Sequence, residues 1–167
     1  MISMRLIVLA IVLLTLITPA LAVTVDVDPK EIYIVPGGYN RTTVNVTVYG
    51  GEFLIKVGYE ITEYNEYLDA RLLDESGNNL TDWGDKGEFS CWLAPGMYTY
   101  ILEIKASSDL PLEDTGTINA IGLTFNTSTF VDWDTESVTV YPIPELATIA
   151  LSAVGLATIG LIVMRRR

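Results

Sequence analysis

The alternation of apolar and polar residues between positions 23 and 141 constrains the fold of this chain more than any other feature. Apolar side chains occupy every second position in residues 44–48, 53–61 and 98–104. Successive side chains of a β-strand point to opposite faces, so this spacing is typical of strands with one buried face. No stretch in this region shows the roughly 3.6-residue period of an amphipathic helix. The alternation therefore predicts an all-β domain.

Clusters of turn residues divide the alternating region into about eight or nine short segments. Such strands must bury their apolar faces against a second sheet. We therefore expect an immunoglobulin-like antiparallel β-sandwich over residues 23–141, with a closed β-barrel as the alternative. The segment Ala94-Pro95-Gly96-Met97-Tyr98 loosely resembles the turn and tyrosine that enter a late strand of immunoglobulin-like domains.

The first 22 residues have the organisation of a secretory signal peptide. Arg5 precedes an apolar run from Leu6 to Ile17, which is too short to span a membrane comfortably. Ala20 and Ala22 form an A-x-A cleavage site, so we expect cleavage before Val23. The alternative is an uncleaved N-terminal anchor.

The C-terminal residues, from position 142 on, predict a membrane anchor. Leu146–Met164 is a run of 19 uncharged residues, and three arginines follow it. A helix of this length spans about 28 Å, close to the thickness of a hydrocarbon core. Positive charge stays on the cytoplasmic side, so we expect a cytoplasmic C-terminus and an extracellular domain over residues 23–141.

The residues Pro144, Glu145 and Leu146, with the apolar run and the arginines that follow them, resemble the PEF-CTERM sorting tail of archaeal surface proteins. The sequence differs from the family pattern at Leu146, where Phe is usual, and at Ala147, where Pro is usual. The resemblance implies recognition by an archaeosortase, cleavage near the motif and transfer to a lipid or another anchor. The alternative is an ordinary stop-transfer helix that is never processed.

The charge of the chain limits its partners. The formal net charge is −11, and residues 23–141 hold six basic and 20 acidic residues, which gives them −14. Such a surface repels nucleic acid and anionic lipid headgroups, so we exclude nucleic-acid binding. A solvated acidic surface explains this charge without any specific ligand.

Four N-x-S/T sequons predict glycosylation of at least one asparagine, since an exported domain meets the glycosylation machinery. The alternative is that Asn and Thr are simply common in exposed strands and turns. The four sequon residues are Asn40, Asn45, Asn79 and Asn126.

Acidic side chains in two segments are weak candidates for a Ca²⁺ site, because this cation prefers several carboxylate and carbonyl oxygens. The first segment holds Asp132, Asp134 and Glu136, and the second is residues 82–88. Neither has the spacing of an EF-hand loop, and solvated acidic loops are the simpler interpretation. No other cofactor is expected.

The residues that usually carry catalysis are scarce. The chain has no histidine, so no Ser-His-Asp or Cys-His pair can form. Cys91 is the only cysteine, and it shares a predicted strand face with Phe89 and Leu93. We expect a buried, unreactive thiol there, with an intermolecular disulfide as the alternative. The sequence therefore predicts a protein that is not an enzyme.

Five aromatic residues suggest a platform on which a sugar could stack, although core packing or single exposed aromatic residues are the simpler interpretation. They are Tyr64, Tyr67, Trp83, Trp92 and Trp133.

Taken together, these features predict an exported, membrane-anchored archaeal cell-surface protein with a structural or adhesive role in the cell envelope. Its expected partners are signal peptidase, an archaeosortase, the membrane, and other surface proteins or glycans. The alternatives are a small sugar- or Ca²⁺-binding module and a subunit of a surface filament.

Overall fold

The computed structural model describes residues 22–113, 115–126 and 129–145. The predicted membrane helix, residues 1–21 of the predicted signal peptide and the side chain of Asn126 lie outside the described residues, and with them Ala20 and Leu146. In the described part no helix has the length and apolar character needed to cross a membrane. The strands of this part are β1 (Val23–Asp28), β2 (Glu31–Ile34), β3 (Tyr39–Val48), β4 (Phe53–Glu63), β5 (Leu68–Leu73), β6 (Lys86–Leu93), β7 (Gly96–Ala106), β8 (Gly116–Asn126) and β9 (Thr129–Pro142).

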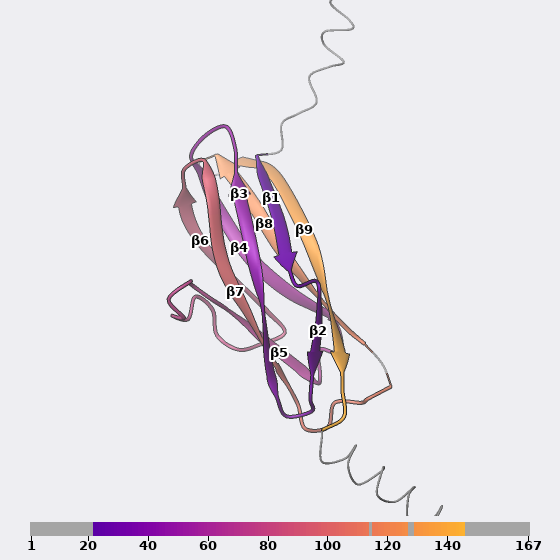
Figure 1. Cartoon of the computed structure of the whole chain (residues 1–167). Coiled ribbons are helices and arrows are strands. Elements are labelled where there is room, and N and C mark those ends of the chain that lie inside the picture. Colours follow the sequence, from indigo (N-terminus) through magenta and orange to yellow (C-terminus); the bar gives the residue numbers. More distant parts are fainter. Residues whose placement is uncertain (1–21, 114, 127–128, 146–167) are drawn as a thin grey trace, which may run out of the picture.

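These strands form two sheets that pack face to face (Figure 1). Sheet A has the order β1-β3-β7-β5, and sheet B has the order β2-β9-β8-β4-β6. The predicted all-β sandwich is therefore confirmed, and the closed barrel is wrong because the described strands make two separate sheets. The expectation of purely antiparallel pairing is also wrong, because β2 runs parallel to β9.

The parallel pair arises where one extended segment changes sheets. β1 pairs with β3 in sheet A as far as Asp28. Pro29 follows, and a proline has no N–H to continue the ladder. Its carbonyl instead accepts a hydrogen bond of 2.7 Å from the Thr42 hydroxyl. The chain then enters sheet B, where Glu31 pairs with Thr139 of β9.

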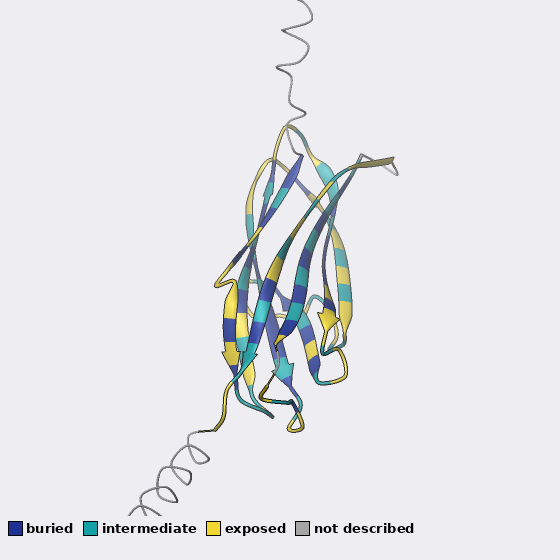
Figure 2. Ribbon diagram, turned by 90° about the vertical axis from the view of Figure 1, so that its right-hand side faces the viewer, coloured by how far each residue is buried: buried dark blue, intermediate teal, exposed yellow. Residues whose placement is uncertain are grey.

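The core lies between the sheets and consists of the alternating apolar residues of both inner faces (Figure 2). Ile55 and Val57 of β4 and Leu102 and Ile104 of β7 belong to this core, and all four are fully buried. Burial of a branched aliphatic side chain contributes about 1.5–3 kcal/mol, so this alternation is the main source of stability. A one-residue slip of any strand would turn its apolar residues out to solvent.

The two sheets approach each other closely where β1 crosses β8. A Cβ atom added at Gly122 would lie 2.7 Å from Cγ2 of Val25 and 3.3 Å from Cγ2 of Val23. Only a glycine leaves room for β1 at this point, and β1 also lies beside β9. This position brings the β1 backbone within reach of the acidic side chains of β9.

Candidate binding face

The outer face of sheet B carries a continuous group of apolar side chains over β6, β4, β8 and β9. We call this group the apolar face. Its residues are Leu54, Trp92, Ile121, Leu123, Phe125, Phe130 and Trp133.

The strand register brings these residues together from distant parts of the sequence. Leu54 of β4 stands opposite Trp92 on one side and Phe125 on the other, and Phe125 stands opposite Phe130. Their side chains form one row across the sheet, and the rings of Phe125 and Phe130 meet edge to face at 5.9 Å. Leu123 and Trp133 are paired one step further along β8 and β9.

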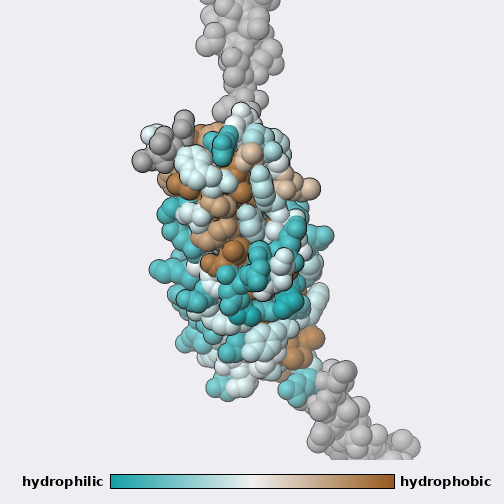
Figure 3. All heavy atoms as spheres, turned by 90° about the vertical axis from the view of Figure 1, so that its left-hand side faces the viewer, coloured by the Kyte–Doolittle hydropathy of each residue, from teal (hydrophilic) through white to brown (hydrophobic). Residues whose placement is uncertain are grey.

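Large aromatic rings on this face are open to solvent. Trp92 is 53% exposed, Phe130 is 52% exposed and Trp133 is 55% exposed. Figure 3 views the molecule from the side of β6 and shows apolar surface in the upper half, with hydrophilic surface below it. A contiguous apolar surface with a polar border is typical of an interaction site, whereas single exposed apolar residues are common everywhere.

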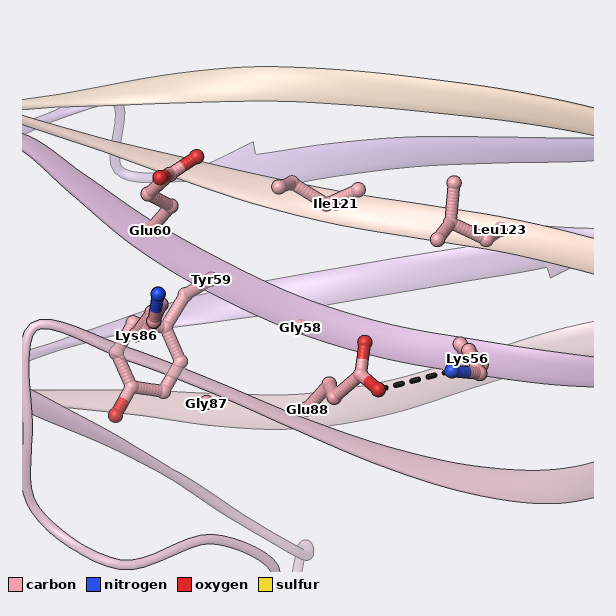
Figure 4. Close-up of a pocket in the computed structure, with 9 residues that line it drawn as sticks. All are labelled: Lys56, Gly58, Tyr59, Glu60, Lys86, Gly87, Glu88, Ile121 and Leu123. Atoms are coloured by element: carbon pink, nitrogen blue, oxygen red, sulfur yellow. Dashed lines mark hydrogen bonds and ion pairs between the residues drawn. The ribbon is translucent and has the colours of Figure 1, made fainter.

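A shallow hollow of about 360 Å³ lies on the same face, beside the apolar row (Figure 4). Gly58 forms its floor. Any larger residue at this position would place its Cβ 2.9 Å from the carbonyl oxygen of Gly87. Ile121 and Leu123 line one side, and Lys56 Nζ forms an ion pair of 2.9 Å with Glu88 on the other. The hollow therefore offers an apolar wall opposite a charged one.

The outer face of sheet A has a different construction. Glu103 of β7 is only 5% exposed and binds the guanidinium groups of Arg41 and Arg71 on the two neighbouring strands. Burial acts to raise the pKa of Glu103, but the hydrogen bonds from both arginines outweigh it and hold this pKa below its ordinary value. Arg71 lies 4.4 Å from the centre of the Trp83 ring, which in turn contacts Tyr39. These groups bind one another and leave little for a ligand.

The acidic residues of β9 that we considered for Ca²⁺ contact β1 instead. Asp132 accepts a hydrogen bond of 2.7 Å from the backbone N–H of Ala22, and Asp134 accepts one of 2.7 Å from that of Val25. Glu136 forms an ion pair of 3.2 Å with Lys30. Across residues 22–145, outside the gaps, no three metal-ligating side chains converge. Calcium binding stays a prediction that these contacts do not support.

The sequon asparagines occupy different environments. Asn40 donates a hydrogen bond of 2.6 Å to the carbonyl of Tyr33, and Asn45 accepts one of 3.0 Å from the Thr99 hydroxyl. Asn79 is exposed in the segment between β5 and β6, whereas Asn40 and Asn45 are partly buried, so Asn79 is the most accessible of the three described sites. Pro144 and Glu145 follow β9 and are also exposed.

The five aromatic residues of the predicted platform do not lie together. Of its five residues, only Trp92 and Trp133 lie on the apolar face, because Trp83 packs on Arg71 of sheet A. Tyr64 and Tyr67 contact each other at 5.8 Å between β4 and β5. Sequence reasoning missed the leucines and phenylalanines that complete the face, since these become neighbours only through strand pairing.

Cys91 is half-buried rather than buried as expected. Its side chain points toward the core, and Sγ lies 4.0 Å from the hydroxyl of Tyr100. Burial raises the pKa of the thiol. The burial is incomplete because β6 is the last strand of its sheet.

Comparison with known proteins gives a likeness of fold. No family model matches the chain, and no curated protein matches it. Among solved structures, E. coli alpha-2-macroglobulin matches with 17% identity over 75% of this chain and 7% of that chain, at a TM-score of 0.50. A chain of the CaDoc0917–CaCohA2 complex matches with 12% identity over 72% of this chain and 99% of that chain, at a TM-score of 0.49. BcpA, the major pilin subunit of Bacillus cereus, matches with 11% identity over 72% and 40% of the respective chains, at 0.48.

The match to alpha-2-macroglobulin shows a shared β-sandwich arrangement and nothing about activity, because the identity is low and the chain spans a small part of that protein. The other two matches are weaker and carry no functional argument.

Proposed function

We propose that this chain is an exported archaeal cell-surface protein, anchored to the membrane at its C-terminus, with an adhesive or structural role in the cell envelope. In this proposal residues 1–22 direct export, and residues 142–167 serve as the anchor or as an archaeosortase substrate. The β-sandwich would then be displayed outside the cell, and it would act by binding rather than by catalysis.

The observation that carries the proposal is the position of the apolar face relative to the C-terminal exit. Phe130 stands at the start of β9, and Pro142 ends this strand 12 residues later. At about 3.3 Å per residue, the two ends of β9 lie about 40 Å apart. The chain leaves the sandwich at the end far from the apolar row (Figure 1). An anchor after Pro142 would hold the apolar face away from the membrane, where a partner can reach it.

The chemistry of the face also favours binding over catalysis. Exposed tryptophan rings are among the residues that contribute most to binding energy at interfaces. Two of the charged groups that line the hollow, Lys56 and Glu88, bind each other. The exclusion of an enzymatic role still depends on the absence of histidine in the sequence.

Binding of the full chain to cell envelopes of its own organism tests the adhesive role. The double variant Trp92→Ser/Trp133→Ser should weaken binding at least about tenfold, because loss of a central aromatic residue costs about 1–2 kcal/mol. The control is Tyr39→Ser, which removes an equally exposed ring from the other outer face. Equal binding by the double variant and the control would refute the proposal.

Membrane attachment needs a separate test, because it depends on residues outside the described part. We expect the native protein in the membrane fraction and accessible to protease on intact cells. Mass spectrometry of its mature C-terminus distinguishes a retained helix from a processed tail near Glu145. Recovery of the whole native chain in the cytosol would exclude both outcomes.

A sugar ligand is the second candidate, and the pairing of exposed rings with charged neighbours favours it. Trp92 and Trp133 present apolar ring faces, while the Lys56–Glu88 pair supplies a donor and an acceptor on the same face of the sheet. A glycan array probed with the full chain and with Trp92→Ser/Trp133→Ser tests this candidate. Binding that both proteins share, or no binding at all, would eliminate it.

A further inference from the structure

The four outer edges of the two sheets are not equally protected. An unpaired edge strand exposes a row of backbone N–H and C=O groups that can pair with another chain, and proteins usually cover such edges. The edge of β1 is covered by Asp132 and Asp134, which accept hydrogen bonds from its backbone. The edge of β2 is covered by β3, where Asn40 donates to the carbonyl of Tyr33.

The edge of β5 is covered by the chain that follows it. The N–H of Ala70 donates to the carbonyl of Gly84 at 2.9 Å, and Gly84 donates back to Ala70 at 3.1 Å. The N–H of Leu72 donates to the hydroxyl of Thr81 at 2.9 Å. Among the described residues, only the outer edge of β6 has no hydrogen bond of this kind, although residues 79–83 lie beside its first residues, Lys86 to Glu88.

The phase of the β4–β6 ladder identifies the open groups of β6. Ile61 donates a hydrogen bond of 2.7 Å to the carbonyl of Asp85, in register with the β4–β6 pairing. Hydrogen-bonded residues alternate along an antiparallel strand, so the odd-numbered residues of β6 bind β4 and the even-numbered ones point outward. The outward N–H and C=O groups belong to Lys86, Glu88, Ser90 and Trp92. They have no hydrogen-bond partner within the described chain.

The side chains of β6 also lack the devices that block strand addition. No proline and no bulge interrupts β6, and the residues from Phe89 to Leu93 are uncharged. Phe89 and Cys91 point toward the core but are only half-buried, because no strand lies beyond β6 to cover them. A further strand would complete the core at this edge.

We infer that β6 pairs with β6 of a second copy of this chain, antiparallel and about a twofold axis at Phe89. Each Lys86 then stands opposite the partner's Trp92, and each Glu88 stands opposite the partner's Ser90. The two copies join their five-stranded sheets into one continuous sheet. Because both copies use the same edge, the assembly closes at two chains and does not grow into a filament.

The charges along β6 favour this register and this partner. The chain has a net charge of −11, so two copies repel each other over most of their surface. On β6, however, Lys86 balances Glu88, and the edge is neutral. The chosen register sets Lys86 against a tryptophan ring, which attracts a cation. If the two β6 strands were shifted by two residues in one direction, the Glu88 side chains of the two copies would stand opposite each other. If they were shifted by two residues in the other direction, Glu88 would stand opposite the partner's Trp92.

The inference does not depend on the anchor or on an adhesive role, since it stands on the geometry of one edge. It also predicts an unusual salt response. Salt screens the general repulsion between the two acidic copies, with a Debye length of about 3 Å at about 1 M, but leaves strand pairing and burial of Phe89 intact. Dimerisation should therefore strengthen as salt increases.

Sedimentation velocity of the full chain, in low salt and in about 1 M salt, is the primary test. We expect a monomer that converts to a dimer as concentration and salt rise. Ser90→Pro removes an outward N–H without touching the β4 ladder, because proline is tolerated on the open side of an edge strand. This variant should weaken dimerisation at least about tenfold, whereas Ser90→Ala should dimerise as the wild type does.

A wild type that stays monomeric in high salt would overturn the inference, and so would a Ser90→Pro variant that is folded by circular dichroism and still dimerises.

A second experiment tests the register itself. In the variant Phe89→Cys/Cys91→Ser, the introduced thiols of the two copies meet at the twofold axis. Opposite residues of a non-hydrogen-bonded pair lie about 4.5 Å apart, within disulfide range. We expect an oxidised dimer from this variant and none from Cys91→Ser, and a monomer from both would contradict the register.

Discussion

The two outer faces of the sandwich share the same strand geometry and differ in what their side chains contact. On sheet A, Glu103 binds Arg41 and Arg71, and Arg71 stacks on Trp83, so the functional groups of this face bind one another. On sheet B, the rings of Trp92 and Trp133 face solvent. A face whose groups are paired internally contributes to stability, and a face whose apolar groups have no such partner is available for binding. Substitutions on the two faces should therefore separate stability from binding.

The largest effect is expected for Glu103→Gln on sheet A. Gln keeps one acceptor oxygen for one of the two arginines, so about one hydrogen bond to a charged group is lost, and such a bond contributes about 1.5–3 kcal/mol to stability. We expect the free energy of unfolding to fall by about 2.5 kcal/mol in urea denaturation at neutral pH. The matched control is Glu60→Gln on sheet B, an exposed residue whose substitution should change stability by less than about 0.5 kcal/mol. Equal losses in the free energy of unfolding at both positions would contradict the proposed difference between the two faces.

The same carboxyl group gives sheet A a dependence on pH. The pKa of Glu103 in the folded protein lies below its ordinary value of 4.5, so its contribution to stability is present above that pH. The contribution is lost as pH falls through the lower folded pKa, when the carboxylate takes up a proton. The stability difference between the wild type and Glu103→Gln should therefore shrink toward zero as pH falls from 7 to about 3. A difference that does not change with pH would show that the charge of Glu103 is unimportant.

Gly58 is the position on the outer face of sheet B where we expect a substitution to reduce stability, unlike other substitutions on this face. A Cβ atom at this position would lie 2.9 Å from the backbone oxygen of Gly87, and a backbone atom cannot move aside easily. Gly58→Ala should cost about 1.5 kcal/mol through crowding between β4 and β6. Gly51→Ala is the control, because its added Cβ would come no closer than 3.7 Å to Phe53. A stable Gly58→Ala variant would mean that the floor of the hollow can deform.

The smallest effects come from a matched pair of tryptophans. Trp83→Leu removes a ring that contacts Arg71, and a cation–π contact at a partly exposed site contributes about 1 kcal/mol. Trp133→Leu removes a ring from the apolar face, and we expect a change below about 0.5 kcal/mol. Thermal melts of both variants measure the difference. A larger loss for Trp133→Leu than for Trp83→Leu would reverse the assignment of the two faces.

The sequence was sufficient to predict the two layers of the fold and most of the strands. Val44, Val46 and Val48 are all buried, as their alternation implies, because a period of two allows only one face to be apolar. It was not sufficient to predict the exchange of one segment between sheets at Pro29. That exchange depends on which strand lies beside β2, and a local pattern holds no information about such distant pairing.

The candidate site was predictable only in part, for the same reason. Trp92 and Trp133 attract notice in the sequence as large polar-edged rings, but Leu54, Phe125 and Phe130 look like ordinary strand residues. Their grouping depends on the register between four strands. The acidic residues of β9 illustrate the converse, because their clustering made them weak candidates for a metal site and the register placed them against β1.

The path of β9 has a mechanical consequence. This single strand leads from Phe130 on the apolar face to Pro142 at the exit of the chain. Tension between a partner bound at that face and a C-terminal anchor would run along the strand axis. The ladders to β8 and β2 lie on either side of β9, so their hydrogen bonds would be loaded in shear and together, rather than opened one after another. If the C-terminus is anchored as proposed, β9 would therefore be the strand best arranged to carry the pull.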